Sequence, residues 1–245
     1  MDRYGIIGYP LGHSKSPAAF KAAYGGRWPF DLIEGTDFEQ LWELFLSRYK
    51  AANITAPFKE IAYAKVDIKN PEIEMIRATN LVINTPDGVT AYNSDYRGVK
   101  QCIIDAGFKA GDTALVVGAG GAGKAAAAAA KSLGLETAVT NRTMRKAAAM
   151  AEFMGLELLP WEDSQSVDLL IYTVPGPIDG VERFGSKAVL EACYAKPTFT
   201  REGLAAQGRA YIDGKQWHYQ QAIAGYGLMT GEKPDTQATR EVYNF

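Results

Sequence analysis

The sequence has little of the chemistry that would hold a metal ion or a disulfide framework. Its 245 residues include only two cysteines and two histidines. Cys102 and Cys193 lie far apart in the chain and form no metal-type pair, so we expect no bound metal. The scarcity of cysteines also favours a reducing compartment, and we expect a cytoplasmic protein.

The sequence also lacks a strong net charge and a long apolar run. A formal net charge of −2 provides no basic field to attract nucleic acid or an anionic membrane. Charges at Asp2 and Arg3 argue against an apolar leader, and the alanine run at 125–130 lies between lysines, which predicts a helix rather than a membrane span. We expect a small-molecule substrate, no nucleic acid and no membrane as partners. The sequence leaves open whether the protein is a monomer or a homodimer.

Strand-like and helix-like segments alternate along the chain. This alternation predicts an α/β protein with largely parallel sheets, and the length suits one large domain or two small ones. A new strand–helix–strand series begins near 95–98, which suggests a domain boundary there. Strands are expected at 4–8, 30–34, 51–54, 81–84, 89–92, 113–117, 137–140, 156–159, 168–172, 188–192 and 210–212. The clearest helices are expected at 38–50, 96–106, 121–133, 143–154 and 215–229.

The most informative window begins at the expected strand 113–117. The sequence GAGGAG follows at once, and an alanine-rich helix follows that, so G-x-G-x-x-G stands in the strand-to-helix setting that a dinucleotide site requires. The glycines let the backbone turn tightly and approach a pyrophosphate at the helix N-terminus. The predicted cofactor contacts in this loop are Gly118, Ala119, Gly120, Gly121 and Ala122. The alternative is a tight turn that binds nothing.

The residues after the next strand favour NADP over NAD. An NAD site commonly has an acidic residue there, which would repel a 2′-phosphate. This chain has Asn141, Arg142 and Thr143 instead, with Lys146 one turn further on. An amide, a guanidinium and a hydroxyl can hold a 2′-phosphate through charge-assisted hydrogen bonds. The alternative is that Thr143 only caps the following helix and that the cations are solvated.

Three segments of the first half carry side chains suited to chemistry. The stretch GHSKSP places Ser14 and Ser16 before a helix, and one of the two serines is expected to cap it. NITAPFKE places Lys59, and NSDYRG places Asp95, after strands, where open α/β sheets keep their ligands. A lysine and a carboxylate together could move a proton. On spacing alone, an exposed lysine and a helix N-cap are the simpler interpretations.

Taken together and in this order, the segments GHSKSP, NITAPFK, ATN, NSD, GAGGAG and NRT resemble the shikimate dehydrogenase family. The resemblance runs from about 4 to 146 and resumes near the C-terminus. It implies reduction of 3-dehydroshikimate to shikimate with NADPH, in chorismate and aromatic amino-acid biosynthesis. It also implies an N-terminal α/β substrate domain (1–95 with 216–245), a Rossmann-type NADP-binding domain (96–215), and a cleft between them.

The resemblance also implies roles for individual residues. Lys59 matches the general acid/base of the family, and Asp95 matches the aspartate that orients it and hydrogen-bonds the substrate. Ser14 and Ser16 match the two hydroxyls that hold the substrate carboxylate. Further matching positions are Thr55, Asn80 and Gln221 at the ring hydroxyls, and Tyr194 and Gly214 beside the nicotinamide and substrate. His13 is expected to be a structural part of its loop, because no carboxylate partner is evident.

The second half departs from the family pattern. The chain has TVPG at 173–176, where the family has an Asn-Ala-Thr-like stretch along the nicotinamide end of the cofactor. Glu191 begins the segment that is usually D-x-x-Y, and Lys215-Gln216-Trp217 replaces a glycine-rich apolar turn. These departures affect the expected contacts with the nicotinamide end of the cofactor more than they affect the expected role of Lys59. Cys193 is expected to be a small buried filler rather than a nucleophile.

Two alternatives to this function stay open. In the first, the enzyme acts on quinate, which differs at one ring carbon, or accepts NAD as well; Arg142 argues against NAD. In the second, the chain is a sensor or scaffold paralogue that binds a dinucleotide without turnover, as the altered loop at 173–176 suggests. The presence of both Lys59 and Asp95 argues against a sensor, because a sensor needs no proton shuttle.

Overall fold

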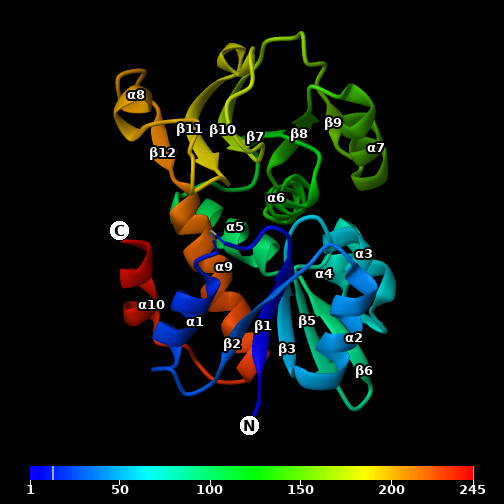
Figure 1. Ribbon diagram of the computed structural model, residues 1–245. Helices are drawn as coiled ribbons and strands as arrows, with labels where there is room; N and C mark the ends of the chain where they lie inside the picture. The colour runs from blue at the N-terminus through cyan, green and yellow to red at the C-terminus, as the bar shows by residue number, and fades with distance from the viewer. Residues whose placement is uncertain (13, 245) are drawn as a thin grey trace. The chain divides into compact units, whose positions relative to one another are not determined.

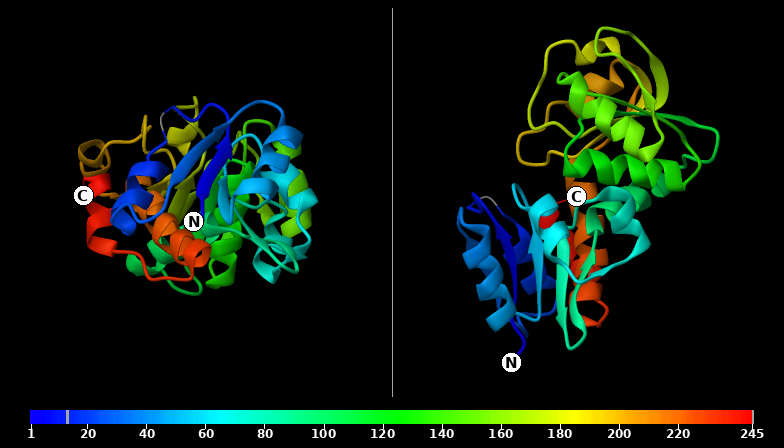
Figure 2. Two further views of the ribbon diagram at one scale, coloured as in Figure 1. Left: turned by 60° about the horizontal axis from the view of Figure 1, so that its bottom comes forward. Right: turned by 90° about the vertical axis from the view of Figure 1, so that its right-hand side faces the viewer.

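The computed structural model describes residues 1–12 and 14–244. The chain forms two compact units, which are shown in Figures 1 and 2. Unit 1 consists of Met1–Ser94 and the segment from Gln221 onward, and unit 2 is Asp95–Gln220. The chain passes from one unit to the other within helices, α5 (Ser94–Asp105) and α9 (Gly214–Thr230). Each unit has a six-stranded sheet within its described residues, so the predicted α/β class is confirmed.

The sheet of unit 1 is mixed rather than largely parallel. Its strands, β1 (Tyr4–Gly8), β2 (Phe30–Glu34), β3 (Ala51–Ile54), β4 (Ile68–Lys69), β5 (Leu81–Thr85) and β6 (Gly88–Tyr92), lie in the order β2-β1-β3-β5-β6-β4. Strand β5 runs antiparallel to both β3 and β6. Only Pro86 and Asp87 separate β5 from β6, and so short a connection can make a hairpin but not a crossover. The reversal brings the start of β5 to the edge where β1 and β3 end.

Helices cover both faces of this sheet. They are α1 (Ser16–Ala23), α2 (Phe38–Arg48), α3 (Lys59–Lys65), α4 (Pro71–Ile76), the end of α9 and α10 (Thr236–Tyr243). Helix α2 begins at a cap, because the Asp37 carboxylate accepts hydrogen bonds from two backbone N–H groups of the first turn. Its apolar residues recur at helical spacing and pack on the sheet: Phe38, Leu41, Trp42 and Phe45. Burial of each of these large side chains stabilises the fold by roughly 2 kcal/mol. Figures 1 and 2 show α2 and α3 on one face and α1 and α9 on the other.

The sheet of unit 2 is parallel throughout. Its strands are β7 (Thr113–Val117), β8 (Glu136–Thr140), β9 (Glu157–Leu158), β10 (Ser166–Tyr172), β11 (Gly185–Glu191) and β12 (Ala210–Ile212), in the order β12-β11-β10-β7-β8-β9. The chain winds outward from β7 to β9 and then returns to the other side of β7. This reversal makes a topological switch point at β7 and β10, and open α/β sheets bind ligands at the carboxyl ends of such strands.

The helices of unit 2 are α5, α6 (Gly121–Ser132), α7 (Met144–Met154), α8 (Arg201–Ala205) and the start of α9, with a 3₁₀ turn at Val181–Arg183. The alanine run at 125–130 is buried in α6, where small side chains let the helix lie close to β7 and β8. Strands β10 and β11 begin earlier than predicted, because their first residues Ser166 and Gly185, which precede the apolar runs, pair with each other. None of the helices in the described part of the chain has the length and apolar composition of a transmembrane span.

Candidate functional site

The topology of unit 1 gathers the predicted substrate residues at one sheet edge. The register places Ile7 of β1 beside Ile54 of β3, and Leu81 of β5 beside both Asn53 and Tyr92. The ends of β1, β3 and β6 and the start of β5 therefore share one edge. The residues that follow or precede these strand ends include Ser14, Ser16, Thr55, Lys59 and Asn80. Residues far apart in the sequence are thus brought together on one side of unit 1.

The serine loop, residues 11–16, leaves β1 and leads into α1. The expected serine cap is present but lies one residue earlier than the N-cap position, which Lys15 occupies without a side-chain cap bond. The Ser14 Oγ accepts a hydrogen bond from the N–H of Ser16, the first residue of α1, at 3.3 Å. The Ser14 hydroxyl keeps its own hydrogen to donate. No described residue forms a hydrogen bond with the Ser16 hydroxyl. His13, expected to be structural, lies outside the described residues.

The second loop of this edge carries Thr55 and Lys59. A Cβ on Gly8 would lie 2.3 Å from the Thr55 Cγ2, so only glycine at the end of β1 lets Thr55 approach it. The Thr55 N–H donates to the Ile7 carbonyl at 2.9 Å, which ties the loop to β1. Lys59 is the first residue of α3 and is half-buried, so the simpler interpretation of an exposed surface lysine does not hold.

The ATN segment connects two parts of this edge. The Thr79 N–H donates to the Lys59 carbonyl at 3.0 Å. The Asn80 Oδ1 accepts from the Ser94 N–H at 2.6 Å, and the Asn80 Nδ2 donates to the Ser94 Oγ at 3.0 Å. Asn80 and Ser94 are both buried. The side chain of Asn80 therefore holds the first residue of α5, directly before Asp95, and keeps one amide hydrogen to donate elsewhere.

Asp95 and Gln221 both lie on helices. Asp95 is 7% exposed and lies within the first turn of α5, so it is not the N-cap residue. A carboxylate in this turn is stabilised by the free N–H groups of the helix N-terminus. In α9, a Cβ on Gly225 would lie 3.2 Å from both Cβ and Oγ of Ser94, so glycine allows close packing there. Gln221 is one helical turn before Gly225, on the same face of α9.

In unit 2, the glycines of the loop after β7 have different physical reasons. Gly118 has φ +115°, and a Cβ there would lie 2.4 Å from the Thr173 Oγ1. A Cβ on Gly123 would lie 2.0 Å from the Gly118 carbonyl oxygen, so α6 can pack against the loop only with glycine. Gly120 has ordinary extended backbone (φ −88°, ψ −173°), and a Cβ there would meet nothing within 4 Å. The fold does not require glycine at 120, but a pyrophosphate approaching the α6 N-terminus would.

The residues predicted to bind the 2′-phosphate follow β8, the strand next to β7. The Gly118 N–H donates to the Thr140 carbonyl at 3.0 Å, which joins the ends of β7 and β8. Thr143 is at the N-cap position of α7, but its side chain makes no cap hydrogen bond. Arg142 and Lys146 are exposed, and no described residue forms an ion pair with Arg142. The donor set of Asn141, Arg142 and Thr143 fits a phosphate.

The unusual TVPG stretch has a local structural role. The Thr173 Oγ1 donates to the Val117 carbonyl at 2.9 Å and contacts the space beside Gly118, so it joins the ends of β7 and β10. The Tyr172 hydroxyl donates to the Gly176 carbonyl at 2.7 Å and holds the stretch against its own strand. Sequence reasoning missed Thr173, because its partner is more than fifty residues away.

The segment after β11 is held by Glu191, the residue at the position of the family aspartate. Its buried carboxylate accepts from the N–H groups of Thr198 and Phe199 and from the Tyr211 hydroxyl. Burial and the bond to this carboxylate raise the pKa of Tyr211 well above its usual range. The Glu191 carboxylate therefore holds both the loop after β11 and the side chain of Tyr211 in β12.

Tyr194 and Gly214 lie close to this segment. The half-buried Tyr194 ring packs against His218, with ring centroids 4.6 Å apart. A Cβ on Gly214 would lie 2.7 Å from the Cys193 carbonyl carbon, so glycine lets α9 begin against the loop. Cys193 is half-buried rather than buried as predicted, and its Sγ lies 3.3 Å from the Lys196 carbonyl oxygen.

Three further residues next to the predicted site were not found from the sequence. Ser94 is held by Asn80, as described above. The Trp217 indole N–H donates to the Asp95 carbonyl at 3.1 Å, and Trp217 belongs to the turn that departs from the family pattern. The Tyr226 hydroxyl donates to the Ser16 carbonyl. The departure at 215–217 was a usable signal for Trp217, whereas an aromatic residue in a helix gave none for Tyr226.

The parallel sheet, the switch point and the glycine loop define unit 2 as a Rossmann-type dinucleotide-binding fold. Residues 6–82 match the family model of the shikimate dehydrogenase substrate binding domain. A relative from Thermus thermophilus, "Shikimate dehydrogenase (NADP(+))", is 32% identical, with 98% of this chain and 97% of that protein covered. One from Haloarcula marismortui with the same name is also 32% identical, covering 95% and 94%. The chain belongs to the shikimate dehydrogenase family.

Solved structures agree with this assignment. Shikimate 5-dehydrogenase from Thermus thermophilus, in complex with NADP(H) and shikimate, is 30% identical to this chain, with a TM-score of 0.87 and coverage of 99% of this chain and 98% of that one. Quinate dehydrogenase from Corynebacterium glutamicum, in complex with NAD, has a TM-score of 0.85 at 24% identity. At that identity the second likeness shows the fold alone.

Proposed function

We propose that this protein is an NADP-dependent shikimate dehydrogenase, which interconverts 3-dehydroshikimate and shikimate by reversible hydride transfer in chorismate and aromatic amino-acid biosynthesis. The observation that carries the proposal is the gathering of Ser14, Ser16, Thr55, Lys59 and Asn80 at one sheet edge, in a chain with full-length relatives named shikimate dehydrogenase. The scarcity of cysteines supports a cytoplasmic location.

The two parts of the chain have separate tasks in this proposal. The substrate-binding domain is 1–95 with 216–245, and the family model that matches 6–82 supports this assignment. The cofactor-binding domain is 96–215, and the switch point at β7 and β10 supports that one.

NADP is the proposed cofactor, and it supplies the hydride when bound. The open space at Gly120 and the free N–H groups of the first turn of α6 suit its pyrophosphate. Asn141, Arg142, Thr143 and Lys146 would hold its 2′-phosphate. The remaining proposed contacts are Gly118 and Ala119 in the loop, Gly121 and Ala122 at the start of α6, and Gly214 at the start of α9.

The proposed chemistry of the chain itself is proton transfer by Lys59, with Asp95 as its carboxylate partner. In the reductive direction the ammonium of Lys59 donates a proton to the carbonyl oxygen of 3-dehydroshikimate, and in the oxidative direction the amine accepts it. The half-buried position of Lys59 supports this role, because a group that exchanges protons with a substrate must reach it and still be partly shielded from water.

The substrate carboxylate would be bound by the hydroxyls of Ser14 and Ser16. Each can donate one hydrogen, because Ser14 uses only a lone pair for the Ser16 N–H, and no described residue bonds the Ser16 hydroxyl. Thr55, Asn80 and Gln221 would bind the ring hydroxyls, with Tyr194 beside them. The free amide hydrogen of Asn80 supports its part in this set.

Absorbance at the reduced-nicotinamide band tests the proposal. Purified protein is supplied with shikimate and NADP⁺, then with NAD⁺ in place of NADP⁺, and then with quinate in place of shikimate. We expect fast turnover that requires NADP⁺ and prefers shikimate. Faster turnover of quinate would instead favour a quinate dehydrogenase, and cofactor binding without turnover of any pair would favour the sensor.

A further inference from the structure

The serine loop is supported by a tyrosine of α9. The Tyr226 hydroxyl donates to the Ser16 carbonyl oxygen at 3.1 Å. Tyr226 is 2% exposed and Ser16 is 6% exposed, so this bond is shielded from water. A buried phenol hydroxyl needs a hydrogen-bond partner, and the carbonyl of the first residue of α1 provides one.

The position of this hydroxyl is fixed by packing. The Tyr226 ring meets the Phe20 ring edge-on, with centroids 5.1 Å apart, and also contacts Phe30. The N–H of Ser16 is also held, because it donates a hydrogen bond to the Ser14 Oγ. The backbone of Ser16 is therefore held at both its N–H and its C=O, which fixes the direction of its Cα–Cβ bond and the place where its hydroxyl can act.

A second contact, from α10, holds the residue between the two serines. The Lys15 Nζ lies 3.5 Å from the Val242 carbonyl oxygen, near the end of α10, and 5.6 Å from the centroid of the Tyr243 ring. The carbonyl end of a helix attracts a cation. Helices α9 and α10 thus both contact the serine loop, α9 at Ser16 and α10 at Lys15.

We propose that Tyr226 is a positioning residue for substrate binding: its hydroxyl holds Ser16 so that the Ser16 hydroxyl meets the substrate carboxylate. This inference rests on the proposed function. It predicts that loss of the Tyr226 hydroxyl weakens binding of the carboxylate and leaves cofactor binding unchanged.

The test variant is Tyr226→Phe, which keeps the ring. We expect the KM for shikimate to rise about three- to tenfold, as loss of one buried hydrogen bond would give. The kcat and the KM for NADP⁺ should change less than about twofold, because a support for the carboxylate site acts on binding. The analogue with a hydroxymethyl group in place of the carboxylate should bind both proteins equally.

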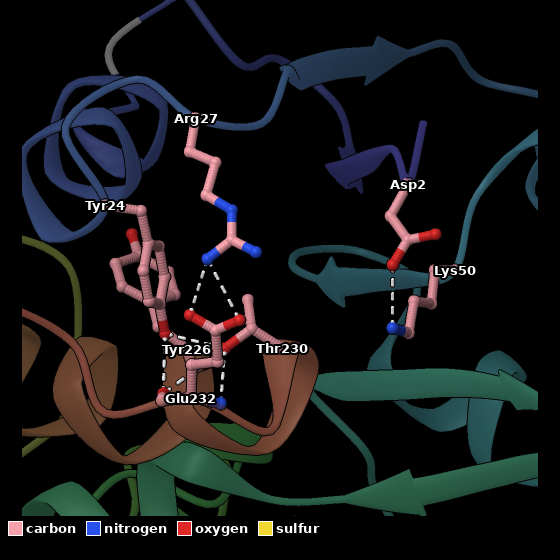
Figure 3. Close-up of polar contacts among 7 residues, drawn as sticks. All are labelled: Asp2, Tyr24, Arg27, Lys50, Tyr226, Thr230 and Glu232. Carbon is pink, nitrogen blue, oxygen red and sulfur yellow. Dashed lines mark hydrogen bonds and ion pairs between the residues drawn. The ribbon is translucent and has the colours of Figure 1, made fainter.

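Tyr24→Phe is the matched control. Tyr24 packs on the same Phe20 ring, at 5.1 Å, but its hydroxyl bonds the Thr230 Oγ1 at 2.8 Å and the Glu232 carbonyl at 3.1 Å. Figure 3 shows this contact between the residue that follows α1 and the end of α9, with Arg27 paired to Glu232 beside it. Tyr24→Phe should lower the thermal unfolding midpoint about as much as Tyr226→Phe and leave the KM for shikimate unchanged.

A double variant tests the route through Ser16. Ser16→Ala keeps the backbone carbonyl but removes the hydroxyl, so adding Tyr226→Phe to Ser16→Ala should raise the KM no further. A wild-type KM in Tyr226→Phe, an equal rise in Tyr24→Phe, or full additivity with Ser16→Ala would overturn the inference. Absence of turnover in the wild type would refute the proposed function instead. In that case, calorimetric titration with shikimate decides the inference. Weaker binding of shikimate by Tyr226→Phe than by the wild type supports it. Equal binding by the two proteins, or no binding by the wild type, overturns it.

Discussion

Gly120→Ala should separate cofactor binding from folding. Gly120 has extended backbone that any residue adopts, and a Cβ there would meet nothing within 4 Å. Gly123, in the first turn of α6, is the matched control from the same glycine motif, because a Cβ there would lie 2.0 Å from the Gly118 carbonyl oxygen. Alanine at 120 therefore fills space that only a ligand would use, whereas alanine at 123 overlaps the protein backbone.

The expected effects on stability follow from this geometry. At position 120, alanine reduces the freedom of the unfolded chain, a gain of about 0.4–1 kcal/mol. It also replaces glycine at the N-cap of α6, a loss of about 0.5–1 kcal/mol. These opposing effects leave the free energy of unfolding within about 1 kcal/mol of wild type. Gly123→Ala should lose about 4 kcal/mol or more, since the backbone must move to admit the methyl group.

The expected effect on cofactor affinity is the reverse. A methyl group on residue 120 would keep the pyrophosphate from one or two N–H donors, at about 1.5–3 kcal/mol for each charge-assisted bond. The Kd of Gly120→Ala for NADPH should therefore rise at least about tenfold. Denaturant unfolding and fluorescence titration with NADPH measure the two quantities. NADPH affinity within twofold of wild type would refute the pyrophosphate assignment, and a stability loss equal to that of Gly123→Ala would refute the geometric argument.

Two other variants test the cofactor site and the sheet of unit 2. Arg142→Ala should weaken NADPH binding at least about tenfold and NADH binding little, because the guanidinium is assigned to the 2′-phosphate; equal losses in the two titrations would contradict this. Asp168 accepts hydrogen bonds from the Lys187 ammonium and from the N–H and hydroxyl of Thr113, which hold the pKa of its carboxyl well below its usual range. A lowered folded-state pKa adds stability above the unfolded-state value of about 4, and this stability is lost as the pH falls below it. Asp168→Asn should therefore lower the free energy of unfolding by about 1–2 kcal/mol at pH 7 and by less near pH 3. An equal loss at both pH values, measured by denaturant unfolding, would contradict the lowered pKa of Asp168.

The strands and the glycine loop were predictable because their signals are local. The strands at 4–8, 30–34, 51–54, 113–117 and 210–212 have the predicted ends, since each apolar run is bounded by glycine, proline or polar residues. The GAGGAG loop needed only the strand before it and the helix after it. The antiparallel β5 had a local signal as well, in the short TPDG connection to β6, but the alternating pattern alone suggested parallel strands.

Supporting contacts within the site could not be predicted from the sequence. Asn80 was predicted as a substrate ligand, but its bonds to Ser94 depend on β5 and β6 forming a hairpin. The bond of Tyr226 could not be predicted either, because its partner Ser16 lies more than two hundred residues earlier in the chain. Sequence motifs indicate which side chains meet the ligand, whereas the contacts that hold those side chains depend on the tertiary fold.

Turnover by the wild type and by Lys59→Ala, measured side by side with shikimate and NADP⁺, tests the central claim most directly. The wild type should form NADPH, and Lys59→Ala should have a kcat lower by about 10²–10⁴-fold with a KM for shikimate within a few fold of wild type, because the lysine transfers the proton and the other residues bind the substrate. Wild-type turnover by Lys59→Ala would remove Lys59 from the mechanism. A wild-type protein that binds NADPH and forms no product would contradict the proposed function itself.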